Sequence, residues 1–199
     1  MHSNKIWYKL GISFFFLVVF FFTSNSITDP DMWFHIKSGE VIANQGIIFH
    51  DVFSSAAPNR PWYPHEWLFQ LGLFRFTSIF GIDAVKYFVG FFATFQIAIL
   101  FIFLRKTLKL KIIASMFVCI MYTLLCYNLF VPRPQLVSQT LFIANTFLLL
   151  AYIFNDKYKK LLFLSIPVTL LWTNIHASVI LNVFLFAGYI PFFNEIATQ

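Results

Sequence analysis

Two carboxylates, Asp29 and Asp31, lie directly after the first apolar run of the chain and are separated by one proline. The run at 6–27 is 22 residues long, and a helix of that length spans about 33 Å, enough to cross a bilayer. We therefore expect the pair where the chain leaves the membrane, a position suited to coordinating a cation or deprotonating a hydroxyl. The alternative is structural, with Asp29-Pro30 as a turn and helix cap and Asp31 in the first helical turn.

Further titratable groups follow in the same segment. Asp31 and His35 are four residues apart and therefore share a face if this segment is helical. Together with Asp29 they form a candidate site for a divalent cation, Mg or Mn, held mainly by oxygen ligands. Glu66, preceded by His65, opens a second predicted helix. In the structural interpretation, Glu66 lies in the first helical turn, where the helix dipole stabilises a negative charge. In the functional interpretation, Glu66 is a second acidic group that folds back over the two aspartates.

Two more candidates lie in later turns. Arg133 stands between two prolines in a predicted outward turn and is interpreted either as an arginine at the membrane interface or as a phosphate clamp. The rigid flanking prolines favour the clamp. His176 interrupts the last apolar stretch, where a lone histidine is usually structural. Because it is predicted on the same membrane face as Arg133 and the aspartates, a role in substrate contact or proton transfer gains weight.

The composition is that of an integral membrane protein. Hydrophobic residues make up 59% of the 199 residues and charged residues only 11%, with 29 Phe and a mean hydropathy of +0.76. A soluble domain of this size cannot hide so much apolar surface. We therefore predict an all-α membrane protein, one transmembrane domain over 1–199, with about six transmembrane helices.

The charges are distributed unevenly, and their positions predict the orientation. Nine of the 14 basic residues fall in three short segments, 5–9, 105–111 and 157–160. The spans between these segments would place all three on the same side of the membrane. The net charge of +6 therefore does not indicate a nucleic-acid partner. By the positive-inside rule, this side and the N-terminus are cytoplasmic. Five of the eight acidic residues lie in the loop at 28–82, and a sixth, Asp83, directly follows it. This loop is then extracytoplasmic and is the predicted working surface.

Apolar periodicity divides the chain further. The first span is predicted at 6–27 and the remaining spans within 84–193, at 84–104, 112–131, 136–154 and a long stretch, 161–193, that splits near His176. Five spans plus a re-entrant pair is the alternative. The loop is predicted to contain two interfacial helices, 31–45 and 65–80. In the second helix, four apolar side chains recur at helical spacing: Phe69, Leu73, Phe76 and Phe80. Three aromatic residues before and at its start are expected at the headgroup level: Trp62, Tyr63 and Trp67.

Several short motifs containing these residues occur in order along the chain: Asp29-Pro30-Asp31-Met32-Trp33-Phe34-His35, Ser38-Gly39-Glu40, Asp51-Val52-Phe53-Ser54, Arg60-Pro61-Trp62, His65-Glu66-Trp67-Leu68, Arg133-Pro134-Gln135 and Trp172-Thr173-Asn174-Ile175-His176. In these motifs the chain resembles the GT-C superfamily of polytopic membrane glycosyltransferases, specifically bacterial members that use polyprenyl-phosphate-linked sugars. The resemblance covers residues 28–177. Superfamily members usually have more spans, so the chain is expected to correspond to their N-terminal part.

The resemblance implies a reaction and residue roles. Asp31 or Asp29 would act as catalytic base or metal contact, and a sugar would move with inversion from its polyprenyl-phosphate donor to an extracytoplasmic acceptor. Arg133 would neutralise the leaving phosphate, while Glu66 and His65 would complete a polar floor and His35 and His176 would contact substrate. The implied location is the bacterial inner membrane, with membrane lipid as the surrounding partner.

Two other functions remain open at this stage. The first is a truncated or non-catalytic membrane subunit that binds lipid phosphate or a partner transferase through the same loop. The second is a transporter, which would need polar groups spread through the membrane midplane. The ionisable groups cluster outside the predicted spans, with His176 as the main exception, so the transporter is the weaker alternative. No oligomeric state is predicted.

Overall fold

The computed structural model describes residues 2–24, 29–56, 60–154 and 156–197, and the side chains within 6–24, 29–56, 60–154 and 160–189. In these residues the regular structure is helical, with one isolated bridge between His50 and Pro61. The predicted start of the loop at Thr28 lies outside the described residues.

In the part of the chain that the structure describes, three helices are long and apolar enough to cross a membrane, by length and composition. They are α1 (His2–Thr23), α4 (Val85–Lys106), which a 3-10 turn precedes, and α6 (Pro134–Phe154). The chain is therefore an all-α membrane protein. The first span, predicted to end at residue 27, ends as a helix at Thr23.

The other expected spans are shorter helical segments. α5 (Ile112–Leu125) has 14 residues and would rise about 21 Å, less than the roughly 30 Å hydrocarbon core. The last apolar stretch contains a 3-10 segment and α7 (Ser165–Thr173), then breaks and continues into α8 (Ile180–Ala197). The break expected near His176 is thus present, whereas within the described residues three of the six expected spans reach spanning length.

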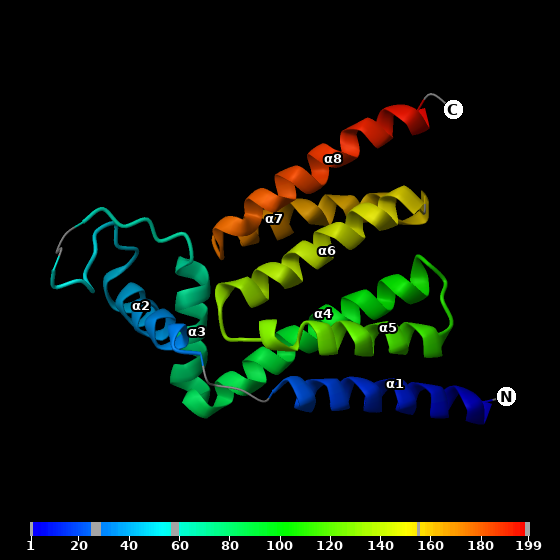
Figure 1. Cartoon of the computed structure of the whole chain (residues 1–199), viewed down its shortest axis with the longest axis horizontal. Helices are drawn as coiled ribbons and strands as arrows, with labels where there is room; N and C mark the ends of the chain where they lie inside the picture. The colour runs from blue at the N-terminus through cyan, green and yellow to red at the C-terminus, as the bar shows by residue number, and fades with distance from the viewer. Residues whose placement is uncertain (1, 25–28, 57–59, 155, 198–199) are drawn as a thin grey trace.

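The long helices lie roughly side by side, and both chain ends lie at one end of this bundle (Figure 1). The helices α2 (Asp31–Gln45) and α3 (Trp67–Phe80) lie at the opposite end. The turn between α5 and α6 and the break between α7 and α8 also lie at that end (Figure 1). Segments that are far apart in the sequence therefore meet beside α2 and α3.

The two loop helices form where the sequence predicts them. α2 occupies the predicted 31–45 and ends at Gly46, whose φ of 81° suits glycine. α3 starts two residues later than predicted and likewise ends at Gly81. The helices pack closely at Gly39, because a Cβ there would collide with the Gln70 carbonyl oxygen and lie 2.6 Å from Phe74 Cβ.

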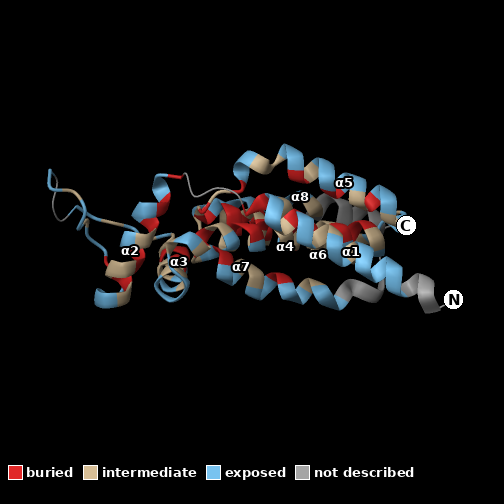
Figure 2. Cartoon of the chain, turned by 90° about the horizontal axis from the view of Figure 1, so that it is seen from below, coloured by how far each residue is buried: buried red, intermediate tan, exposed pale blue. Residues whose placement is uncertain are grey.

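The apolar stripe of α3 lies partly in the protein interior rather than wholly in the membrane interface. Phe69 and Leu73 are buried in a core cluster with Met32 of α2 and Val85 of α4, seen as buried positions where these helices meet (Figure 2). Only the end of the stripe is free, with Phe80 64% exposed. The helix that was predicted to lie on the membrane is therefore anchored to the bundle at its start.

Polar side chains link the helices within the apolar bundle. Gln96 of α4 donates to the Leu136 carbonyl and to Thr140 Oγ1 of α6, both at 2.9 Å, and accepts from Tyr122 of α5 at 3.0 Å. These bonds satisfy a fully buried amide and fix the first turns of α6, which follow Arg133.

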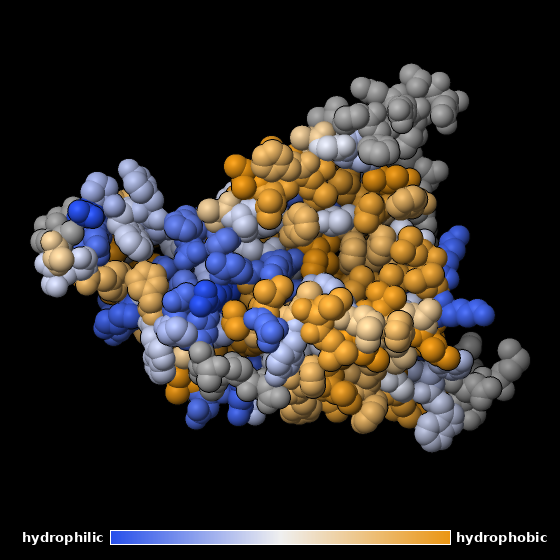
Figure 3. All heavy atoms as spheres, viewed as in Figure 1, coloured by the Kyte–Doolittle hydropathy of each residue, from blue (hydrophilic) through white to orange (hydrophobic). Residues whose placement is uncertain are grey.

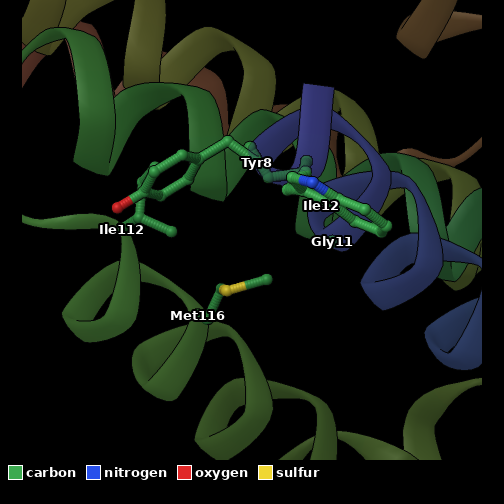
Figure 4. Close-up of a pocket in the computed structure, with 6 residues that line it drawn as sticks. Tyr8, Gly11, Ile12, Ile112 and Met116 are labelled. Carbon is green, nitrogen blue, oxygen red and sulfur yellow. The ribbon is translucent and has the colours of Figure 1, made fainter. Parts of the chain in front are cut away.

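On the face seen in Figure 3, the surface of the bundle is mostly apolar, whereas polar residues gather over α2, α3 and the nearby turns. A shallow groove between α1 and α5 shows the character of the apolar face and is lined by Trp7, Tyr8, Gly11, Ile12, Ile112 and Met116 (Figure 4). It contains no carboxylate, histidine or basic side chain, so the groups able to do acid–base chemistry are elsewhere.

Candidate functional site

A network of ion pairs joins the start of α2 to the turn before α6. Arg133 binds Asp29 through two parallel contacts, Nε to Oδ2 at 2.5 Å and Nη2 to Oδ1 at 2.7 Å. Its third nitrogen, Nη1, lies 3.0 Å from Asp31 Oδ2. One guanidinium therefore holds both carboxylates of the Asp-Pro-Asp motif, across 104 residues of sequence.

The two carboxylates have different environments. The side chain of Asp29 is 3% exposed, whereas that of Asp31 is 55% exposed. The hydrogen bonds from Arg133 lower the pKa of Asp29 despite its burial, and Asp29 Oδ1 also accepts from the Asp31 backbone N–H at 3.2 Å. Asp29 thus forms the predicted turn at the helix start, but Pro30 stands at the N-cap position and there is no side-chain cap hydrogen bond. In addition, Asp29 forms an ion pair. Asp31 is the accessible carboxylate.

A second cluster surrounds Glu66, the residue directly before α3. Its carboxylate is 16% exposed and has three histidines around it, each from a different segment. His35 Nδ1 of α2 lies 3.8 Å from Oε2, and Nε2 of both His65 and His176 lies 3.6 Å from Oε1. These separations are longer than hydrogen bonds, so the contacts are electrostatic.

Local hydrogen bonds determine which nitrogens of two histidines carry a proton. His176 Nδ1 accepts from the Ser178 backbone N–H at 3.1 Å, so in the neutral ring Nε2 carries the proton and presents it to Glu66. His65 Nδ1 lies 3.0 Å from the Tyr63 carbonyl, which can only accept, so in the neutral ring Nε2 has a lone pair facing Glu66.

Burial changes the protonation of this cluster. Burial lowers the pKa of His35 to about 4. Burial also raises the pKa of Glu66, and the negative charge of Asp31 adds to this increase. Burial also lowers the pKa of His176. Although His35 and Glu66 lie as close as an ion pair, His35 is therefore neutral near pH 7, and its buried Nδ1 has no hydrogen-bond partner among the described residues.

The helix break between α7 and α8 is fixed directly on α3. The Trp67 indole N–H donates to Asn174 Oδ1 at 3.0 Å, and the Leu68 backbone N–H donates to the Asn174 carbonyl at 3.1 Å. This double contact places His176, two residues further on, beside Glu66. The charge of Asp31 acts on both His35 and Glu66, so the two clusters form one electrostatic site.

The seven residues singled out from the sequence thus meet in two adjoining clusters: Asp29, Asp31 and Arg133, and His35, His65, Glu66 and His176. Sequence reasoning did not single out Ser178, which orients His176, or the part of Asn174 in fixing the break. It also missed three amides near Arg133: Asn128, Gln135 and Gln139. The four-residue spacing of Gln135 and Gln139 was the available signal, because it puts both on one helix face.

The predicted divalent cation would need oxygen ligands that are not already engaged by other groups. Both oxygens of Asp29, one of the two predicted ligands, are engaged by Arg133. In the part of the chain that the structure describes, no group of three or more His, Cys, Asp or Glu side chains is arranged to hold a metal ion. No ready-made cation site is therefore present among the described side chains. The divalent cation stays a prediction, and the reaction proposed below does not depend on it.

Comparison of the chain with protein-family models, with curated proteins and with solved structures finds no significant match.

Proposed function

We propose that this chain is a membrane glycosyltransferase, or the catalytic part of one, that moves a sugar from a polyprenyl-phosphate donor to an extracytoplasmic acceptor. The observation that supports it most is the meeting of Asp31, Arg133 and Glu66 at one end of an apolar bundle. A base, a cation and a buried acid beside a membrane suit a reaction in which a lipid carries the donor.

Asp31 is the proposed base. It takes the proton of an acceptor hydroxyl while that oxygen forms a bond to the anomeric carbon. The bond from that carbon to the phosphate oxygen breaks, its electron pair leaves with the lipid phosphate, and the configuration inverts. Asp29 is a poorer base, because Arg133 engages both its oxygens and lowers its pKa.

Arg133 is the proposed phosphate contact. Its Nε and Nη2 bind the buried Asp29, whereas Nη1 faces the exposed Asp31. A donor phosphate that replaces Asp31 at Nη1 would receive a charge-assisted hydrogen bond and release Asp31 to act as base. The Asp29 pair would stay intact and keep the guanidinium in position. Glu66 and the three histidines would form the polar floor that contacts the sugar hydroxyls.

The proposed orientation follows the charge distribution. The basic residues Arg105, Lys106, Lys109 and Lys111 lie where α4 joins α5, at the end of the bundle away from α2 and α3 (Figure 1). We place this basic end in the cytoplasm of a bacterium and the acidic site outside its inner membrane. Nucleotide sugars are absent there, which is why a lipid-linked donor is required.

The test is transfer from radiolabelled polyprenyl-phosphate hexoses and pentoses in membranes containing the full chain. We expect Asp31→Asn to lower transfer 10²- to 10⁴-fold, the usual effect of losing a general base, with the protein level unchanged. Asp83→Asn is the matched control, since Asp83 is an exposed acid directly after the same loop and lies outside both clusters. Full transfer by Asp31→Asn would rule out its role as base.

One observation favours the second candidate, a non-catalytic subunit that binds a partner transferase. Arg133 engages both aspartates, which suits a purely structural acidic loop. This candidate predicts no transfer by the purified chain and recovery of transfer when a longer transferase is bound. Asp31→Asn would then leave transfer by the complex unchanged.

A further inference from the structure

An open cavity of about 470 Å³ lies beside the Asp29–Arg133 pair, outside the Glu66 cluster. It is formed by the start of the α2 segment, the turn between α5 and α6, and the first turns of α6. Its lining residues are Asp29, Pro30, Asn128, Leu129, Val131, Arg133, Gln135 and Gln139. The volume falls in the range of small-molecule sites.

The described lining of this cavity is partly polar and partly apolar, and its charges balance. Its two charged members, Asp29 and Arg133, bind each other in a bidentate ion pair, and Asp31 is not part of the lining. The remaining polar groups are three side-chain amides. A neutral ligand can therefore enter without leaving an unpaired charge on the wall, whereas an anion would face a cation that is already paired.

The three amides come from two elements. Asn128 and Gln135 are exposed and Gln139 is half-buried, so all three can reach a ligand in the cavity. Asn128 belongs to the 3-10 turn Tyr127–Leu129, while Gln135 and Gln139 are one turn apart on α6. None of the three makes a side-chain hydrogen bond to another described residue. Each amide offers an acceptor oxygen and two donor hydrogens, which matches a hydroxyl group, itself both donor and acceptor.

We propose that this cavity binds one neutral sugar ring through Asn128, Gln135 and Gln139. The assignment of that ring to the donor or acceptor of a transfer reaction rests on the proposed function, whereas binding itself does not. Arg133 connects the cavity to Asp31, since Nη1 lies 3.0 Å from the Asp31 carboxylate. A sugar in the cavity would thus lie beside the proposed base, with its hydroxyls replacing water at the amides.

The experiment is saturation-transfer NMR on the full chain in lipid nanodiscs with methyl glycosides of glucose, mannose, galactose and arabinose, and separately with inorganic phosphate. We expect at least one glycoside to bind and Gln139→Leu to weaken its binding tenfold or more, with Gln135→Leu in the same direction. Gln45→Leu is the control, because Gln45 is an exposed glutamine at the far end of α2. Unchanged circular dichroism would show that each variant folds.

Three results would overturn the inference. The first two are the absence of glycoside binding by the unaltered chain and glycoside binding that the α6 variants leave unchanged. Phosphate binding that those variants abolish, in the absence of glycoside binding, would also overturn it by showing an anion site. Glycoside binding through the amides without any sugar transfer would support the cavity and refute the proposed function. Transfer that depends on Asp31 but not on the amides would do the opposite.

Discussion

The ion pair between Asp29 and Arg133 predicts an asymmetric response to mutation. Arg133→Gln removes the cation and leaves a carboxylate whose side chain is only 3% exposed. Stranding one partner of a buried pair destabilises by 3–5 kcal/mol, and because Arg133 is itself 38% exposed we expect the lower end, about 3 kcal/mol. Asp29→Asn leaves Arg133 paired with Asp31 and retains an acceptor oxygen, so we expect a loss of about 1 kcal/mol.

The assay is unfolding of the purified chain by SDS titration, followed by tryptophan fluorescence at pH 7. In the double variant no buried charge is stranded, so Arg133→Gln should cost only about 1 kcal/mol in the Asp29→Asn background, a coupling of about 2 kcal/mol. Equal losses for the two single variants, or additive losses in the double variant, would refute the reasoning, because either result means that the carboxylate is not buried with Arg133 as its partner.

The pH dependence provides a second check on the same cause. In the unaltered chain the pKa of Asp29 is lowered, so its stabilising contribution is present above the ordinary value of 3.8 and is lost as the pH falls below it. In Arg133→Gln the stranded carboxyl is relieved by protonation. The stability difference between the two proteins should therefore narrow as the pH approaches and passes 3.8, and a constant difference would contradict an electrostatic origin.

Two further perturbations test the packing and protonation of the site. Gly39→Ala should destabilise the chain by about 1–3 kcal/mol, because the new methyl group meets the backbone of α3. Gly72→Ala, with open space around it, should be neutral or stabilising by about 0.5–1 kcal/mol. Equal effects of the two variants in SDS unfolding would disprove the close helix contact. Since burial lowers the pKa of His35 from 6.5 to about 4, the unfolded chain binds a proton in that interval that the folded chain does not, and stability should fall by on the order of 3 kcal/mol from pH 6.5 to 4. The raised pKa of Glu66 changes the stability in the opposite direction. The contribution of His35 is therefore measured as the difference in the pH dependence of stability between the unaltered chain and His35→Phe. Identical pH profiles of the two proteins would contradict a buried neutral His35.

Local signals in the sequence predicted the loop helices well. The 31–45 helix was predicted to its last residue, because Gly46 supplies the positive φ that ends it. The second helix starts two residues late, at Trp67, since the Trp67 N–H still bonds to the Pro64 carbonyl in a turn. The break near His176 was visible as polar residues within an apolar run.

Long-range contacts account for what the sequence could not predict. Periodicity identified the apolar stripe of Phe69 and Leu73 but could not distinguish lipid from the Val85 and Met32 side chains that cover it. The sequence placed Arg133 and Asp29 on the same membrane side, yet a bidentate pair across 104 residues depends on how α6 docks. Likewise, α5 was expected to span, and its helix ends at Leu125 before reaching that length.

The double contact of Asn174 with α3 has a consequence for biosynthesis. The acidic side of the site emerges from the ribosome first, and its partners Arg133 and His176 follow about 100 and about 150 residues later. At 5–20 residues per second this interval is roughly 7–30 s for His176. Asp29 and Glu66 are thus synthesised well before their partners: Asp29 waits for Arg133, and Glu66 waits for His176. The contact between Glu66 and His176 forms only when Asn174 docks on Trp67.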